Sequence, residues 1–123
     1  MAGPIVLDVE GWRLVADPAH GGRIVSCFWQ GHPILVPGTP GVPPEQEHAG
    51  SFPLVPFSNR IESASFPFQG QTITLHAPEF LMPFALHGHG WRSPWQVSAS
   101  TPSLLVMEHV HRPGSWPWPY RAV

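Results

Sequence analysis

Lysine is absent from the chain, cysteine occurs once, at Cys27, and charged residues make up only 11% of the 123 positions. Without lysine the chain offers no amine for Schiff-base chemistry, which excludes several classes of enzyme. A single cysteine cannot form an internal disulfide, so we expect a reducing compartment. Cys27 lies in the segment RIVSCFW, where a buried structural thiol is a better interpretation than a nucleophile.

Positive charge is also sparse. All six basic residues are arginines, and they are scattered along the chain: Arg13, Arg23, Arg60, Arg92, Arg112 and Arg121. Because the net charge is −2 and there is no basic stripe, we expect no nucleic-acid partner. No apolar run reaches the roughly 18–20 residues that cross a bilayer, and the opening MAGPIVLDVE lacks the basic and apolar regions of a signal peptide. These absences predict a soluble, cytoplasmic protein without a membrane partner.

Long helical segments are missing as well, since 17 prolines interrupt most of the chain. Short segments rich in β-branched and aromatic residues lie between the prolines, and a hydrophobic content of 42% suffices for a folded core. We therefore predict a single all-β domain over residues 1–123. The expected strands are residues 5–9, 12–16, 23–29, 63–68, 71–75, 95–100 and 103–111. The Pro/Gly-rich segment 37–51 is predicted to be a loop.

Two pairs of histidines have H-x-H spacing, His87 with His89 and His109 with His111. Alternate side chains of a strand share a face, so either pair could offer two imidazoles to one metal ion. A cupin-type metal site would also need a glutamate and a further histidine in register, and the nearest carboxylates do not have that spacing. We therefore assign no metal ligand, and a metal-dependent barrel is the least favoured alternative.

Arginine, histidine and tryptophan together suggest sugar recognition, although each also has a structural interpretation. Arg60 follows a proline-stiffened apolar segment in FPLVPFSNRI, and its planar fork suits paired hydroxyls or a carboxylate. His87, in ALHGHGW, offers a donor and acceptor near neutral pH beside a glycine. The six tryptophans offer flat apolar faces of the kind that contact pyranose rings, but tryptophan in a small β-protein is usually part of the core.

Four motifs in order resemble the N-terminal part of the aldose 1-epimerase (galactose mutarotase) family. They are FPLVPFSNRI, the hairpin FPFQGQTITL, LHGHGWRSPWQV and WPWPYRA, and the similarity runs from about residue 22 to the end. The resemblance implies an antiparallel β-sandwich of the galactose mutarotase-like supersandwich type that binds a free aldohexose and interconverts its α and β anomers. It also implies that no cofactor and no metal are needed.

The same resemblance assigns the site residues. Arg60 occupies the position of the family arginine that binds sugar hydroxyls, and His87 that of the histidine near the ring oxygen. His87 is therefore the predicted catalytic residue, and Arg60, His87 and Asn59 are the predicted substrate-binding residues. Asn59 is expected mainly to hold the loop.

The general acid and base of the family, a histidine and a C-terminal glutamate, follow the WPWPY region, and no residue of this chain matches either one. We interpret the chain as a catalytically incomplete fragment of an epimerase. The alternative is a small sandwich that binds carbohydrate without turning it over. An incomplete sandwich leaves strand edges unpaired, so self-association is also expected.

Overall fold

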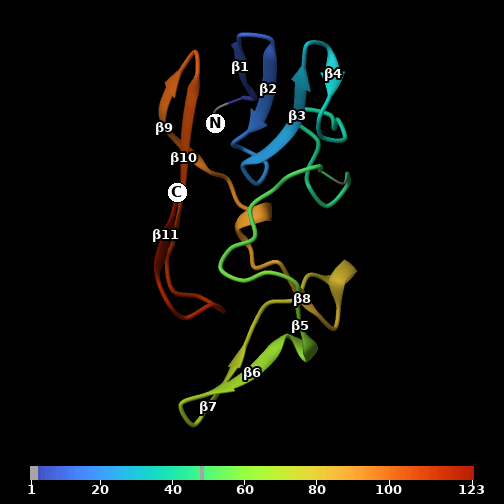
Figure 1. Ribbon diagram of the computed structural model, residues 1–123. Coiled ribbons are helices and arrows are strands. Elements are labelled where there is room, and N and C mark those ends of the chain that lie inside the picture. The colour runs from blue at the N-terminus through green and yellow to red at the C-terminus, as the bar shows by residue number, and fades with distance from the viewer. Residues whose placement is uncertain (1–2, 48) are drawn as a thin grey trace.

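The structure is a computed structural model that describes residues 3–47 and 49–123. Its N-terminal part is an antiparallel sheet with the strand order β1 (Ile5–Val9), β2 (Trp12–Asp17), β3 (Arg23–Trp29) and β4 (His32–Pro33). A second antiparallel sheet contains β9 (Gln96–Thr101), β10 (Leu104–His111) and β11 (Tyr120–Ala122), with β10 in the centre. In Figure 1 the first sheet and the β9–β10 pair lie at one end of the molecule, β11 lies further along its side, and the middle of the chain extends away from that end.

The middle of the chain contains two short antiparallel pairs. β5 (Arg60–Ile61) pairs with β8 (Ala85–Leu86), and β6 (Ser65–Phe68) pairs with β7 (Gln71–Thr74) in a hairpin. Short 3-10 turns connect these strands, namely η1 (Glu62–Ala64), η2 (Glu79–Leu81) and η3 (Gly90–Arg92). Since the described residues contain no α-helix, the all-β prediction is confirmed.

The strand predictions agree closely with the structure, with one informative exception. Residues 5–9 and 23–29 form strands with the predicted bounds. Four other strands differ from the predicted bounds by one residue at one or both ends, and the first strand of the hairpin starts later. That strand begins at Ser65 rather than at Ser63. Ser63 and Ala64 have positive φ angles of 55° and 51° and belong to the 3-10 turn, which brings the chain out of β5. The prediction for Ser63 and Ala64 was therefore wrong.

A buried arginine anchors the predicted loop 37–51 to the first sheet. Arg23 is fully buried at the start of β3, and its Nη2 donates to the carbonyl oxygens of Thr39 and Val42 at 2.8 and 2.9 Å. Its Nη1 donates to Glu47 at 3.4 Å. Asp17, also fully buried, accepts a hydrogen bond from the Gly41 N–H at 2.9 Å. Apart from residue 48, which lies outside the described set, the loop is thus anchored by buried polar contacts.

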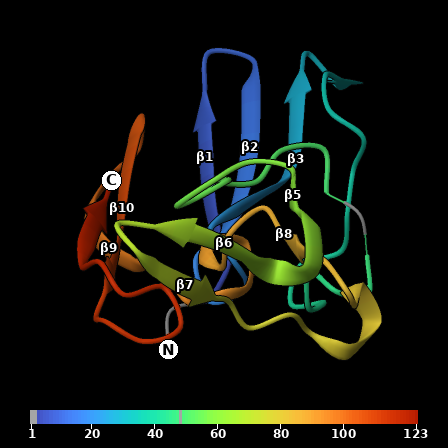
Figure 2. The ribbon, with the colours of Figure 1, turned by 90° about the horizontal axis from the view of Figure 1, so that it is seen from below.

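The hairpin β6–β7 packs onto the loop that joins β10 to β11. Ala64, Leu75 and Ala85 form a small buried cluster to which side chains of the hairpin and Trp116 contribute. Aromatic contacts extend this surface: Phe57–Trp116 at 5.8 Å, Phe66–Trp116 and Phe66–Trp118 at 6.3 Å, and Phe68–Trp118 at 5.2 Å between ring centroids. Figure 2 shows the hairpin reaching this loop. The sequence motif WPWPY therefore closes the apolar face of the hairpin.

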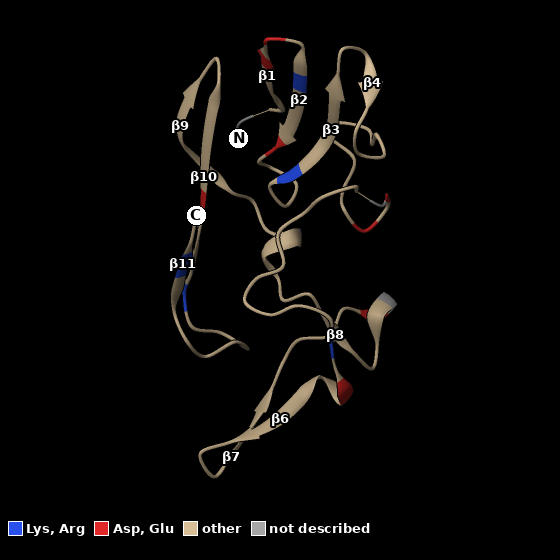
Figure 3. Ribbon diagram, in the orientation of Figure 1, with Lys and Arg blue, Asp and Glu red and all other residues tan. Residues whose placement is uncertain are grey.

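The surface carries few charges and several large apolar side chains. Figure 3 shows acidic and basic residues spread over the ribbon without a continuous stretch of either. Val36, Met82 and Val123 are 74%, 65% and 70% exposed. This exposure is compatible with the expected self-association, which stays a prediction. Within the described residues, no helix has the length and apolar character needed to cross a membrane.

Replacing Trp116 by alanine should destabilise the protein by about 3 kcal/mol, because the substitution removes the aromatic cover of the hairpin. Trp12→Ala is the matched control, since Trp12 is 46% exposed and its ring contacts that of Trp29 with a centroid distance of 4.9 Å. This substitution should cost about half as much or less. Urea unfolding measures both values. Equal losses would contradict the assigned packing role of Trp116.

Candidate functional site

Pairing of β5 with β8 brings together the two sequence motifs that carry the predicted site. Arg60 lies opposite Leu86 in the ladder, so the preceding Asn59 meets the following His87. The His87 N–H donates to the Asn59 carbonyl at 2.9 Å, and the Asn59 N–H donates to His87 Nδ1, also at 2.9 Å. Asn59 Oδ1 accepts from the Arg60 N–H at 2.9 Å. All three predicted residues are therefore direct neighbours.

The hydrogen bond to Nδ1 determines the protonation of His87. A backbone N–H can only donate, so Nδ1 is the acceptor and the neutral ring carries its proton on Nε2. Burial, followed by the positive charge of Arg60, lowers the pKa of His87 below its usual 6.5. At neutral pH the imidazole is thus uncharged and presents an Nε2–H donor.

The backbone at Val55 explains why an apolar, proline-rich segment precedes the Asn-Arg pair. The Val55 carbonyl accepts hydrogen bonds from the N–H groups of His89 and Gly90, both at 3.0 Å. Gly88 lies against the same carbonyl at a positive φ of 64°, and a Cβ there would collide with it. Glycine is required at Gly88 for this reason, and the close contact holds the loop that carries His87.

Arg60 leaves its guanidinium accessible. The residue is exposed, its Cζ lies 5.6 Å from the centre of the Phe84 ring, and it takes part in none of the ion pairs of the described residues. A guanidinium on an aromatic face keeps its five donors in one plane. Arg60 is therefore available to bind a polar ligand beside His87.

A cavity of about 350 Å³ has His87 in its wall. Phe52 meets the imidazole edge-on at 5.8 Å, and Trp91 anchors its indole by donating from Nε1 to the Leu86 carbonyl at 3.1 Å. Glu45 adds a carboxylate to the lining. The volume lies within the range of roughly 300–1,000 Å³ that is typical of small-molecule sites. Neither Arg60 nor Asn59 is among the lining residues, so of the three predicted residues His87 alone faces this cavity.

The sequence analysis assigned no individual site role to the other wall residues of this cavity, among them Phe52, Trp91 and Glu45. Phe52 begins the motif that ends at Arg60, and Trp91 ends the motif that contains His87, so their positions within the motifs were the available signal. Glu45 had no such signal, because it lies in the proline-rich loop that long-range contacts, including those of Arg23 and Asp17, hold against the sheet.

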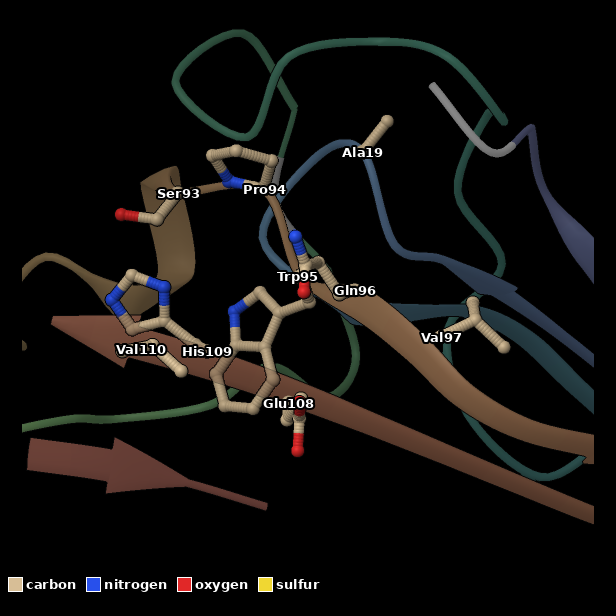
Figure 4. Close-up of a pocket in the computed structure, with 9 residues that line it drawn as sticks. All are labelled: Ala19, Ser93, Pro94, Trp95, Gln96, Val97, Glu108, His109 and Val110. Carbon is tan, nitrogen blue, oxygen red and sulfur yellow. The ribbon is translucent and has the colours of Figure 1, made fainter.

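A larger cavity lies elsewhere and does not contain the predicted site residues. It measures about 740 Å³ and is bounded by β9, β10 and the turn at Ala19 (Figure 4). Its titratable residues are His109, whose ring lies beside the Trp95 indole at 5.6 Å, and Glu108, which accepts a hydrogen bond from Arg121 Nε at 3.0 Å. An ion-paired carboxylate is a poor candidate for a catalytic base, which agrees with leaving Glu108 unassigned.

The structure groups His89 with the second H-x-H pair, His109 and His111. His89 turns away from His87 and lies 5.6 Å from the ring of His109 and 4.4 Å from that of His111. Its Nε2 shares a hydrogen bond of 2.7 Å with the Tyr120 hydroxyl. In residues 3–47 and 49–123, no group of three or more histidine, cysteine or acidic side chains has the geometry to hold a metal ion.

In this histidine cluster, the ring of His89 is uncharged at neutral pH. Burial, followed by the neighbouring histidines and Arg92, lowers the pKa of His89 to about 4. Burial also raises the pKa of Tyr120 to about 12. The hydroxyl therefore keeps its proton and can donate it to the neutral ring of His89, which ties the loop at His89 to β11.

The sequence profile of the family described as aldose 1-epimerase matches residues 9–123. Two uncharacterized proteins of Escherichia coli are relatives. YphB is 34% identical over 103 residues, which make up 82% of this chain and 34% of YphB. YihR is 30% identical over 101 residues, 81% of this chain and 32% of YihR.

Solved structures agree with these relatives. A candidate aldose 1-epimerase of Escherichia coli superposes with a TM-score of 0.76 and 28% identity, over 90% of this chain and 37% of that one. A galactose mutarotase-like protein of Clostridium acetobutylicum gives 0.64 and 22%, over 88% and 34%. The chain therefore belongs to the aldose 1-epimerase family and has its mutarotase-like antiparallel sandwich fold. It spans about a third of the length of the curated relatives that it matches.

Stability should fall as the pH drops from about 6.5 towards 4, the window between the ordinary and the lowered pKa of His89. In that window the unfolded chain binds a proton that the folded His89 does not, so acid favours unfolding. Replacing His89 by glutamine should flatten the dependence without abolishing it, because the pKa values of His87 and His109 are lowered too.

Urea unfolding at a series of pH values measures this slope. His32→Gln, at an exposed histidine in β4, is the matched control and should keep the slope of the parent protein. The assignment is wrong if the His89 variant keeps it as well.

Proposed function

We propose that this chain supplies the sugar-contacting part of an aldose 1-epimerase that interconverts the α and β anomers of a free aldohexose. The observation that carries the proposal is the pair of hydrogen bonds between Asn59 and His87, which presents an Nε2–H donor to a cavity walled by Phe52 and Trp91. Family membership and the mutarotase-like fold support the same reaction class.

In the proposed reaction, a base removes the proton of the C1 hydroxyl while an acid protonates the ring oxygen. The ring opens to the aldehyde, the C1–C2 bond rotates, and closure on the other face reverses both proton transfers. No atom is gained or lost, and each transferred proton returns when the ring closes.

His87 acts as a hydrogen-bond donor in the proposed reaction. Its neutral ring donates from Nε2 to the sugar near the ring oxygen, where negative charge develops as the C1–O5 bond breaks. The hydrogen bond from Asn59 to Nδ1 fixes the ring orientation, so Asn59 acts as a positioning residue. Arg60 binds sugar hydroxyls through its planar donors, and Phe52 and Trp91 offer apolar surface to the C–H face of the pyranose.

We further propose that the general acid and base come from the part of the epimerase domain that this chain does not span. Two findings support this proposal. The chain covers 34% and 32% of its two relatives, and Glu108, the carboxylate of the cavity between β9 and β10, is engaged with Arg121.

Replacing Arg60 by alanine should weaken binding of glucose or galactose about tenfold to a hundredfold, because a hydrogen bond to a charged donor contributes roughly 1.5–3 kcal/mol. His87→Ala should weaken binding about tenfold. NMR titration of the chain with each sugar measures both effects. Arg112→Ala, at an exposed arginine outside the motif, is the control and should leave affinity unchanged. Unchanged affinity in the Arg60 variant would rule out the assignment.

Polarimetry tests whether this chain binds the sugar without catalysing the interconversion of its anomers. The chain should bind α-D-glucose or α-D-galactose yet leave the decay of optical rotation at the rate of buffer, since it lacks a matched acid and base. Acceleration that disappears in His87→Ala would contradict this expectation and show that the described residues include both groups.

A further inference from the structure

A second cavity, of about 190 Å³, has a wall rich in groups that are or can become cationic. Its lining includes His76 from the segment after β7, His89 from the loop before η3, Arg92 from η3, and His111 from the end of β10. The lining contains no carboxylate. Three segments that are distant in sequence, around His76, His89–Arg92 and His111, thus bring nitrogen donors to one small space whose lining contains no counter-charge.

Arg92 is a partly buried arginine without an ion pair. Arg13, Arg23 and Arg121 each pair with a carboxylate, whereas Arg92, like the exposed Arg60 and Arg112, takes part in none of the ion pairs found among the described residues. Its Nε is buried without a hydrogen-bond partner in that same part of the chain. Its Cζ lies 5.6 Å from the centre of the Trp91 ring. A half-buried guanidinium stays charged, so an unpaired donor there is costly unless something accepts from it.

Two histidines of the cavity, His89 and His111, each use one ring nitrogen in a hydrogen bond and have no partner for the other among the described residues. His89 Nε2 bonds to the Tyr120 hydroxyl, and His111 Nε2 lies 2.7 Å from the Trp116 carbonyl oxygen and donates to it. Each ring therefore keeps Nδ1 for another partner. His76 is exposed at the rim. When protonated, all three rings can donate to the same acceptor.

We propose that this cavity binds a small tetrahedral oxyanion, sulfate or phosphate, through Arg92 and the imidazoles of His76, His89 and His111. Guanidinium and imidazolium groups form strong, charge-assisted hydrogen bonds to such ions. The volume exceeds the roughly 30 Å³ share of one water and falls short of the roughly 300 Å³ at which pockets for organic ligands begin. This size favours a free ion over the phosphate group of a bound sugar. The site is separate from the His87 cavity and does not depend on the proposed function.

Binding at this site should be coupled to proton uptake. The groups that face these histidines are His109 and Tyr120, and Glu45 acts on Arg92 only at longer range. Without an anion, burial and mutual repulsion keep His89 neutral. A bound anion reverses that repulsion and favours the protonated rings, so affinity rises as the pH falls.

Thermal unfolding with sodium sulfate, compared with chloride at equal ionic strength, tests the proposal. Sulfate suits the test because its charge does not change over the pH range used. Sulfate at about ten times its dissociation constant should raise the Tm by about 4 °C at pH near 5.5, and less at pH near 7.5. Arg92→Gln should abolish the rise, and His76→Gln, at an exposed position that leaves the fold intact, should reduce it.

Two matched controls, Arg112→Gln and His32→Gln, remove an exposed charge and an exposed imidazole away from the cavity and should keep the full rise. A rise that persists in the His76 and Arg92 variants, or no rise at either pH, overturns the proposal. If the Arg92 variant does not fold, the His76 variant decides. Inorganic phosphate and glucose 6-phosphate, with glucose as reference, then identify the source of the anion: a shift with inorganic phosphate that exceeds the shift with glucose 6-phosphate supports the free ion, and an equal or larger shift with glucose 6-phosphate overturns it.

Discussion

Two hydrogen bonds between Asn59 and His87 are the constraint on which the candidate site depends. They close a ladder of only two residue pairs, β5 with β8, and they join motifs that are far apart in the sequence. A backbone donor on one ring nitrogen leaves the other as the only proton carrier, so the chemistry of the imidazole is determined by main-chain geometry. The Val55 carbonyl then holds the loop through Gly88, and the cavity wall follows from these positions.

Strands that depend on local sequence patterns were predicted well from the sequence. Strands such as Ile5–Val9 and Arg23–Trp29 show in alternating or β-branched segments bounded by turns. The neighbouring positions of Arg60, Asn59 and His87 were predictable because the family motifs preserve their order. Their roles towards a sugar are still a prediction, since geometry alone does not identify a ligand.

Other features could not be read from the sequence because they depend on long-range contacts. Arg23 resembled any arginine at a strand start, yet it is fully buried and holds a distant loop. That loop brings Glu45 to the cavity of His87, and no local pattern signals this. The pairing of His89 with Tyr120 likewise requires β10 and β11 to be in place. Periodicity describes which face a residue occupies but not what covers that face.

Abundant proline and scarce charge have a common effect on the interior. Each proline removes a backbone donor and keeps its carbonyl, so a chain with 17 prolines has surplus acceptors. Side-chain donors satisfy several main-chain carbonyls here. Arg23 serves Thr39 and Val42, Trp95 serves Gly90, and the remaining examples are Trp91 with Leu86 and His111 with Trp116. In this protein, tryptophan and histidine side chains therefore donate to main-chain carbonyls that backbone N–H groups commonly satisfy in other proteins.

The aromatic contacts of the hairpin β6–β7 have a consequence for synthesis on the ribosome. Phe66 and Phe68 leave the exit tunnel well before Trp116 and Trp118, which cover them in the native protein. During that interval the hairpin lacks the aromatic cover that Trp116 and Trp118 provide, and its apolar surface stays partly exposed until both tryptophans have been synthesised.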